Sequence, residues 1–235
     1  MRIAVVSDIH GNRTALEAVL ADVRQTSPDL VLHGGDLADG GSSPAEIVDQ
    51  IRDLGWPGVL GNTDELMFNP ACLPRPFAAV EAIAAATREA LGEARISWLR
   101  CLPMVHVQAP LALVHASPGN CWRSPGVEAT DAELTTAYAP LGMSLAVYAH
   151  IHQPFIRNVD GMMVVNTGSV SLSYDGDARA SYLLLDGLKA QIRRVEYDVQ
   201  KEIKALSHRQ IPHADWIARM LVSARLQMPD AMSLA

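Results

Sequence analysis

In the first half of the chain, short continuous apolar runs alternate with segments in which apolar residues recur at helical spacing. Short apolar runs bounded by turn residues predict three strands, at residues 3–6, 30–33 and 58–60. Between these runs, apolar residues recur with helical spacing, which predicts helices at residues 14–24 and 44–54. This β-α-β-α-β order predicts parallel strands joined by right-handed crossovers.

The second half is richer in strand-like runs. The predicted strands are residues 104–108, 111–115, 145–149, 155–159, 162–166, 182–186 and 191–197. Asp-Gly pairs at residues 160–161 and 186–187 lie between neighbouring runs and are typical of hairpin turns, so we expect antiparallel pairs. Helical spacing returns in an Ala-rich run at residues 78–91, in a short segment ending at residue 102, and at residues 199–207 and 214–226. Residues 117–139 form the longest irregular stretch.

Composition limits the classes of protein to which the chain can belong. With 235 residues, 49% of them hydrophobic, we expect one globular domain over residues 1–235. The net charge of -7 argues against an extended nucleic-acid surface, and no window approaches the roughly 18 apolar residues that cross a bilayer. The first apolar run is too short for a signal peptide. Cys72, Cys101 and Cys121 lack zinc-type spacing and predict free thiols in a reducing compartment, so we expect a cytoplasmic protein.

Residue types that bind metals follow five of the predicted strands. Asp8 and His10 lie two residues apart after the first run, and we expect their side chains to point the same way because strand side chains alternate. Open α/β sheets bind ligands at the carboxyl ends of their strands. The further candidates at such ends are Asp36, Asn62 with Asp64, His115, and His150 with His152.

Each candidate alone has an ordinary structural explanation. An aspartate after a strand is commonly a turn residue or a helix N-cap, and a histidine at a strand end is commonly hydrogen-bonded within the core. Together, in a βαβ frame, these residues favour a metal site. The full ligand set is too large for one tetrahedral zinc ion and suits two divalent ions that share a carboxylate: Asp8, His10, Asp36, Asn62, His115, His150 and His152.

The order of these residues resembles the motifs of the calcineurin-like metallophosphoesterases: D-x-H, G-D, G-N-H-[DE], a lone H and G-H-x-H. The corresponding segments are residues 8–10, 35–36, 61–64, 115 and 149–152, and residues 166–170 are similar to the family's N-x-G-S segment. The opening S-D-I-H-G-N and the run V-H-A-S-P at residues 114–118 are more similar to the small bacterial and archaeal branch grouped with diadenosine tetraphosphatase-like proteins. The resemblance covers nearly the whole chain.

The resemblance implies an α/β (α+β) fold, namely a four-layer α/β/β/α sandwich of two mixed β-sheets flanked by helices. It implies one metal held by Asp8, His10 and His152, a second held by Asn62, His115 and His150, and Asp36 as the bridge. A hydroxide between the two ions would attack phosphorus in line. Mn²⁺ is the first expectation for this ligand set, with Fe, Ni or Zn as alternatives.

Two positions depart from the family pattern. Ala149 replaces a glycine, which a strand end accommodates. Thr63 replaces the usual catalytic histidine, which is thought to support the transition-state phosphate or to protonate the leaving oxygen. We expect activity that is slower or biased toward better leaving groups, since general acid catalysis is worth about 10² to 10⁴ in rate. Asp36, Asn62 and Asp64 are the catalytic candidates.

We therefore expect a metal-dependent phosphoric ester hydrolase that acts on a small phosphomonoester, phosphodiester or nucleotide. Asn12, Arg13 and Arg123 are candidate substrate contacts, with a turn, an exposed helix start and a solvated charge as the respective alternatives. Residues 69–91 and 117–139 are expected to set specificity. A metal-binding but catalytically weak scaffold on the same fold is the alternative function, and Thr63 is the feature that favours it. The oligomeric state is open.

Overall fold

The computed structural model describes residues 1–73 and 77–229. The first half follows the predicted order of strands and helices: β1 (Arg2–Val6), α1 (Arg13–Thr26), β2 (Leu30–His33) and α2 (Pro44–Leu54). The predicted third strand at residues 58–60 was wrong, because only Gly58 pairs with β2, through a single bridge to His33. The chain then turns away, and Leu60 N donates to Pro103 O instead.

Two mixed sheets form the centre of the molecule. The four-stranded sheet has the order β2-β1-β8-β9, in which β1 is parallel to β2 and antiparallel to β8 (Ala180–Asp186), which also pairs with β9 (Lys189–Val195). The five-stranded sheet has the order β3-β4-β5-β7-β6. Its strands are β3 (Val105–Gln108), β4 (Leu111–Val114), β5 (Leu145–Tyr148), β6 (Phe155–Val159) and β7 (Met162–Asn166).

The strand directions in the second half were only partly predicted. The expected antiparallel pairs are present in β3 with β4, β6 with β7, and β8 with β9. However, β4 runs parallel to β5, and β5 runs parallel to β7. These parallel pairs bring the carboxyl ends of β4 and β5 to the same edge of the sheet, and these are the ends that precede His115 and His150.

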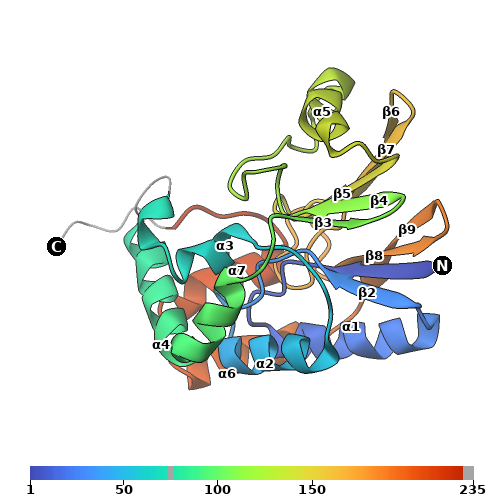
Figure 1. Cartoon of the computed structure of the whole chain (residues 1–235). Helices are drawn as coiled ribbons and strands as arrows, with labels where there is room; N and C mark the ends of the chain where they lie inside the picture. The colour runs from blue at the N-terminus through green and yellow to red at the C-terminus, as the bar shows by residue number, and fades with distance from the viewer. Residues whose placement is uncertain (74–76, 230–235) are drawn as a thin grey trace.

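The sheets pack face to face, which confirms the predicted four-layer α/β/β/α sandwich. Residues in β1 alternate between two cores: Ala4 and Val6 pack against the helices, whereas Ile3 and Val5 pack against the other sheet. In β5, Leu145 and Val147 likewise face the inter-sheet core, and Ala146 and Tyr148 face α5 (Asp131–Tyr138). Figure 1 shows α1 and α2 on one outer face and α5 on the other.

Helices α3 (Asn62–Leu66) and α5 were not predicted. Helix α5 has a capping box in which Thr130 accepts from the Glu133 amide and Glu133 accepts from the Thr130 amide, so T-x-x-E was the missed signal.

Helix α4 (Ala78–Arg100) leaves the helical conformation at Gly92, with φ 66° and ψ 167°, which agrees with the two helices predicted there. Residues 74–76, in the predicted specificity stretch 69–91, lie outside the described residues.

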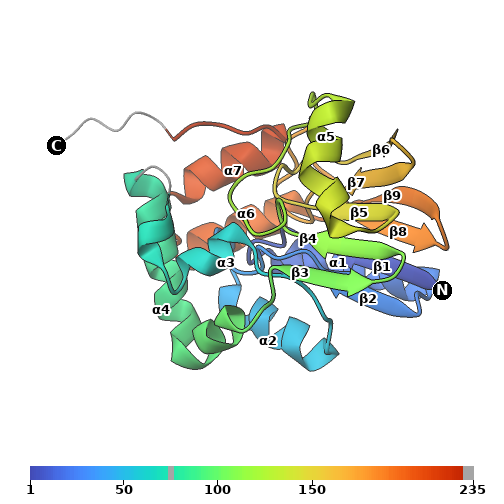
Figure 2. The ribbon, with the colours of Figure 1, turned by 45° about the horizontal axis from the view of Figure 1, so that its top comes forward.

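Helices α6 (Val199–His208) and α7 (Ala214–Ser223) follow β9 in the chain. They lie at the end of the molecule occupied by α3 and α4 (Figures 1 and 2). Ile83 of α4 packs in one core cluster with Leu206 of α6 and Ile217 of α7. None of the helices in the described part of the chain has the length and apolar character needed to cross a membrane. The loops that leave β1 and β2 enter this helical end, and they carry the first candidate ligands.

Candidate metal centre

The loops after β1 and β2 are held together by their backbones. Amides of Asp8, His10 and Gly11 donate to carbonyls of Gly35, Asp36 and Leu37, at 3.0, 3.0 and 2.8 Å. Asp8 and His10 lie beyond the last residue of β1 and have φ values of 53° and 48°. Their side chains converge because of this left-handed backbone, so the expected reason, alternation along a strand, was wrong.

Left-handed backbone recurs across the predicted ligands. Asp36, His150 and His152 also have positive φ, at 53°, 67° and 58°. Non-glycine residues in this region cost of order 1–3 kcal/mol each and persist only where surrounding contacts impose them. Their concentration at five of the predicted ligands marks this region as a functional site.

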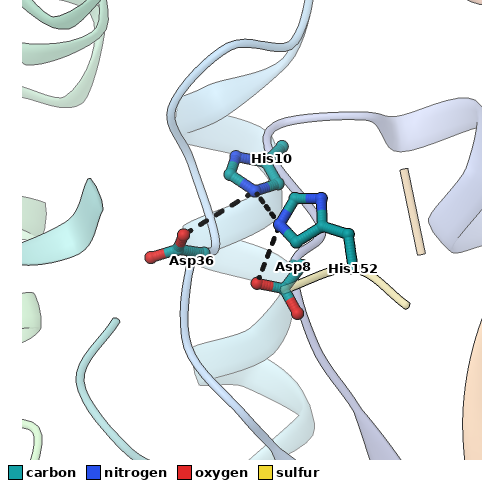
Figure 3. A group of neighbouring side chains, drawn as sticks. All are labelled: Asp8, His10, Asp36 and His152. Atoms are coloured by element: carbon teal, nitrogen blue, oxygen red, sulfur yellow. Dashed lines mark hydrogen bonds and ion pairs between the residues drawn. The ribbon is translucent and has the colours of Figure 1, made fainter. Parts of the chain in front are cut away.

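Four of the predicted ligands form one compact cluster, shown in Figure 3: Asp8, His10, Asp36 and His152. One potential ligand atom from each lies within 4.8 Å of the others, and all four residues are buried. His152 Nε2 lies 3.3 Å from Asp8 Oδ1, and His10 Nε2 lies 3.7 Å from Asp36 Oδ2. Nε2 of His10 and Nε2 of His152 face each other at 3.3 Å.

Backbone carbonyls fix the tautomers of these histidines. Nδ1 of His10 lies 2.8 Å from Asp39 O, and Nδ1 of His152 lies 2.6 Å from Leu172 O. A carbonyl oxygen only accepts hydrogen bonds, so each Nδ1 carries a hydrogen and each neutral ring directs its Nε2 lone pair into the cluster. Two facing lone pairs beside two carboxylates favour a positive charge between them, which a proton or a metal ion supplies. A divalent metal fits the donor set, which includes the buried Asp8 Oδ1 at 3.3 Å from His152 Nε2.

The electrostatics of the cluster agree with a cation site. Burial opposes ionisation of Asp8, yet the neighbouring His152, His115 and His10 hold the pKa of this carboxyl well below its usual range. Burial lowers the pKa of His10, whereas for His152 the attraction of Asp8 outweighs burial and raises the pKa. Without a metal, therefore, the cluster favours an ionised Asp8 and draws a proton to His152.

The other predicted ligands form a second cluster around Asn62. Asn62 Oδ1 lies 2.8 Å from His115 Nε2 and 2.8 Å from His150 Nδ1. His115 Nδ1 lies 2.7 Å from Gly34 O, so its Nε2 also directs a lone pair inward. Burial and the neighbouring His115 lower the pKa of His150 to about 4, which keeps this ring neutral and able to bind a metal.

Asp36 lies between the two clusters. Its Oδ2 faces His10 Nε2 at 3.7 Å, and its Oδ1 faces His115 Nε2 at 3.5 Å. The Thr63 amide also donates to Oδ1, at 2.9 Å, which fixes the carboxylate plane. The structure thus brings all seven predicted metal ligands together, in two groups that share one carboxylate.

Comparison with known proteins decides the family. The model of the calcineurin-like phosphoesterase superfamily domain matches residues 1–189. The chain belongs to this superfamily. Its members are phosphoesterases, and the buried cluster of metal-ligand residues is consistent with divalent metals in this chain. Residues 190–235 lie beyond the match, so their assignment to the same domain stays a prediction.

Two relatives illustrate the range of the superfamily. The chain is 28% identical over 247 residues to an uncharacterized protein of Methanocaldococcus jannaschii, covering 95% of this chain and 98% of that protein. It is 30% identical over 146 residues to a symmetrical bis(5'-nucleosyl)-tetraphosphatase of Methylococcus capsulatus, covering 59% of this chain and 51% of that enzyme. The second match agrees with the predicted likeness to tetraphosphatase-like phosphoesterases.

Two solved structures share the calcineurin-like phosphoesterase fold. A metallophosphoesterase from Sphaerobacter thermophilus superposes with a TM-score of 0.81 at 26% identity, covering 95% of this chain and all of that one (100%). A hypothetical protein from Pyrococcus horikoshii superposes with a TM-score of 0.84 at 21% identity, covering 94% of this chain and 97% of that one. Each superposition covers at least 94% of this chain.

In the superfamily's G-N-H-[DE] segment, this chain has Thr63 followed by Asp64. The Asp64 carboxylate accepts from the amides of Asp36, Leu37 and Gly61, at 2.8, 2.9 and 3.1 Å. Burial and the nearby Asp36 carboxylate raise the pKa of Asp64 to about 7. Asp64 therefore lies behind the ligands and positions the Asp36 loop. The Thr63 hydroxyl is buried and has no hydrogen-bond partner among the described residues.

The candidate substrate contacts of this phosphoesterase lie in different surroundings. Asn12 is buried; its Oδ1 caps α1 by accepting from the Ala15 amide, and its Nδ2 donates to Ser171 Oγ. Arg13 pairs with Glu17 on the exposed side of α1. Arg123 is exposed, and its backbone amide donates to Asn120 Oδ1. Among the described contacts, none joins these three side chains to the seven ligands.

Sequence reasoning missed the groups that hold the ligand loops from behind. Ser7 Oγ donates to Asp8 Oδ2 at 2.8 Å, and Ser169 Oγ donates to Asp8 O at 2.9 Å. Asn166 Nδ2 donates to Ala149 O at 2.6 Å, just before the two histidines. The N-x-G-S segment was the available signal for Asn166 and Ser169. The backbone carbonyls that contact the histidines could not be predicted from the sequence, because every residue has a carbonyl.

Proposed function

We propose that the chain is a phosphoesterase with two divalent metal ions, which hydrolyses a phosphomonoester, a phosphodiester or a nucleotide. The observation that carries this proposal is the position of the Asp36 carboxylate. Its two oxygens face ligand histidines of different clusters, at 3.7 Å from His10 Nε2 and 3.5 Å from His115 Nε2. A carboxylate in this position suits two ions that act on one phosphoryl group.

Asp8, His10 and His152 would hold one ion, and Asn62, His115 and His150 would hold the other, with Asp36 shared between them. Mn²⁺ suits this mixture of imidazole, carboxylate and amide ligands, and Fe, Ni or Zn are alternatives. Bound ions would supply a hydroxide nucleophile near neutral pH and positive charge for the phosphoryl oxygens.

The chain's own residues orient this chemistry. The hydrogens on Nδ1 of His10, His115 and His152 are held by backbone carbonyls, so these rings cannot rotate away from the centre. Asp64 holds the amides of the Asp36 and Gly61 loops, which supports a positioning contribution to catalysis by this residue. Asn62 would hold one ion through its Oδ1, which lies 2.8 Å from His115 Nε2 and 2.8 Å from His150 Nδ1.

Proton delivery to the leaving group is the step for which this chain is poorly equipped. Thr63 stands where the superfamily pattern has a histidine, and a threonine hydroxyl does not supply a proton as an imidazolium does. We therefore propose a preference for esters whose leaving group departs without protonation. Arg123 remains our proposed contact for the phosphoryl oxygens, whereas Asn12 and Arg13 would first have to leave Ser171 and Glu17.

The test uses metal-stripped protein, with and without added Mn²⁺, and the substrates p-nitrophenyl phosphate and bis-p-nitrophenyl phosphate. We expect turnover that returns with Mn²⁺ and is lost in Asp36→Asn, but not in the matched control Asp53→Asn, which changes an exposed aspartate of α2. The ratio of the two rates would assign the monoester or diester class. Diadenosine tetraphosphate belongs in the same assay, because the Methylococcus relative carries a tetraphosphatase name.

Thr63 favours one alternative function, a metal-binding scaffold with little activity. This alternative predicts two bound ions per chain, measured by elemental analysis, together with no turnover of any of the three substrates. Turnover that needs both Mn²⁺ and Asp36 would exclude it.

A further inference from the structure

A hollow of about 160 Å³ lies beside the metal centre, and we call it the α4/α7 hollow after the helices that form its walls. Its polar end is lined by His10, Asp39 and Thr63. His10 is a ligand of the first cluster, and the Thr63 amide donates to the shared carboxylate of Asp36. The hollow thus adjoins the place where a phosphoryl group would bind, within reach of its ester substituent.

The walls of the α4/α7 hollow are apolar. Val80 and Ile83 of α4 line one side, and Trp216, Ile217 and Met220 of α7 line the other. Figure 2 shows α3, α4 and α7 gathered at the end of the molecule opposite the N-terminus. The hydrophobic effect would favour an apolar substituent here over water.

An aromatic ring connects the hollow to the metal ligands. Tyr174 lines the hollow and stacks on His152, with the ring centroids 4.6 Å apart and the planes tilted by 14°. A flat group that entered the hollow would meet the faces or edges of Tyr174 and Trp216, which favours rings over branched chains. The size agrees, because apolar cavities of roughly 150 Å³ admit one benzene molecule.

Two buried polar atoms at the mouth of the hollow have no partner among the described residues. These atoms are Asp39 Oδ1 and Thr63 Oγ1, and Asp39 is only 7% exposed. Buried polar atoms without partners are rare and cost free energy, unless a ligand or water satisfies them. The Thr63 hydroxyl lies at the polar end of the hollow with His10 and could donate a hydrogen bond to an ester oxygen, which only accepts.

We propose that the α4/α7 hollow binds a ring-sized apolar substituent of the phosphoester, next to the scissile bond. This inference rests on the proposed function, because it takes the phosphoryl group to bind at the two-metal centre. The expected substrate is therefore a phosphoester that carries an aromatic or similarly sized apolar group, and not the phosphoester of a small polar alcohol.

The first test measures binding without turnover. Metal-loaded full-length protein is titrated with benzylphosphonate and with methylphosphonate, and tryptophan fluorescence is followed, because Trp216 lines the hollow. We expect benzylphosphonate to bind roughly 10- to 100-fold more tightly. We also expect its fluorescence change to be lost in Trp216→Phe. Equal affinities would overturn the proposal.

The second test fills the hollow from each wall separately. Val80→Phe and Ile217→Phe should each reduce the benzyl-to-methyl affinity ratio by about tenfold, because the added ring occupies the space. Val222→Phe is the matched control, since Val222 is 60% exposed on α7. Circular dichroism melts identify a variant that fails to fold. If neither variant folds, the benzylphosphonate and methylphosphonate titrations of the unsubstituted protein decide the proposal. An unchanged ratio in a folded variant would contradict the proposal.

A third measurement separates this proposal from the proposed function. Benzyl phosphate and ethyl phosphate have leaving alcohols of similar acidity, so their relative kcat/KM reports binding of the substituent. A rate preference for the benzyl ester supports both proposals. Equal kcat/KM values for the two esters would overturn the proposed binding site in the hollow but not the phosphoesterase. A binding preference together with no hydrolysis of p-nitrophenyl phosphate or bis-p-nitrophenyl phosphate would overturn the phosphoesterase and leave an apolar binding site.

Discussion

The two halves of the proposed metal centre differ in charge and in burial. The first half has two carboxylates, Asp8 and Asp36, beside two buried histidines, His10 and His152. The second half shares Asp36 but otherwise has neutral ligands, and its His150 is only partly buried. A divalent cation is attracted more strongly where two negative charges are buried beside it. We infer that the first ion binds tightly and that the second is the ion that exchanges.

Removing the carboxylate that only the first half has should produce the largest effect. We expect Asp8→Asn to weaken binding of the tighter Mn²⁺ ion by about 10²-fold and to lower p-nitrophenyl ester turnover by roughly 10²- to 10³-fold. Isothermal titration calorimetry of metal-stripped protein separates the two ions. Asp53→Asn should leave both affinities unchanged. If Asp8→Asn weakened only the looser ion, our assignment of the halves would be reversed.

A substitution at position 63 tests the effect of the histidine that Thr63 replaces beside the second half. Thr63→His should raise the hydrolysis rate of an alkyl phosphate by about 10²-fold, because an imidazolium protonates a poor leaving group. The rate with a p-nitrophenyl ester should change little, since p-nitrophenolate leaves without a proton. Thr63→Gln is the control, because it adds bulk without a titratable group. Equal gains on both substrates would exclude proton donation as the cause.

Adding charge to the second half should reduce the difference between the halves. Asn62→Asp keeps an oxygen near His115 and His150 and adds one negative charge. We expect the looser Mn²⁺ ion to bind about tenfold more tightly, since part of the added attraction is offset by burial of the charge. Calorimetry would again resolve the two affinities. A second affinity that stayed the same or fell would show that charge does not explain the difference.

A further expected effect, on stability and not on metal binding, concerns a histidine outside the metal centre. His33 is buried, neither ring nitrogen has a hydrogen-bond partner among the described residues, and burial with the nearby His106 lowers its pKa to about 3. Below pH 6.5 the unfolded chain binds a proton that the folded chain does not, so stability falls as the pH falls from about 6.5 to about 3. This residue should account for about 2 kcal/mol between pH 7 and pH 5.

Urea unfolding of metal-free protein at the two pH values measures this effect. In His33→Leu the part of the pH dependence that belongs to His33 should disappear, while the part that belongs to the metal-centre histidines remains. An identical loss of stability in the native chain and in the variant would show that His33 titrates normally.

The sequence pattern predicted only a βαβ first half and a β-rich second half, and the four layers were implied by the resemblance to the calcineurin-like metallophosphoesterases. Residues 3–6 are all apolar, so the sequence does not reveal that Ile3 and Val5 face the other sheet while Ala4 and Val6 face the helices. It did not predict that β4, β5 and β7 run parallel, since their pairing joins residues far apart in the chain. The run at residues 58–60 was mistaken for a strand because its apolar residues form only one bridge to β2.

The ligand residues could be identified from their order, but their geometry could not. The spacing of Asp8 and His10 is local, whereas their left-handed backbone depends on hydrogen bonds to Gly35 and Asp36. The roles of Asp64 and Asn12 were hidden for the same reason, because each accepts amides at positions that only the folded loops define. The sequence identifies the side chains of the site, but it does not show which backbone amides and carbonyls those side chains contact in the folded chain.

The left-handed ligand loops also connect metal supply to the lifetime of the protein. Energy stored in five unfavourable backbone conformations lowers the stability of the empty chain, and each tenfold excess of free ion over its dissociation constant restores about 1.4 kcal/mol. A cell short of the metal would thus hold a less stable chain, which proteases remove sooner. In this way the abundance of the protein would follow the availability of its ion, with no separate sensor.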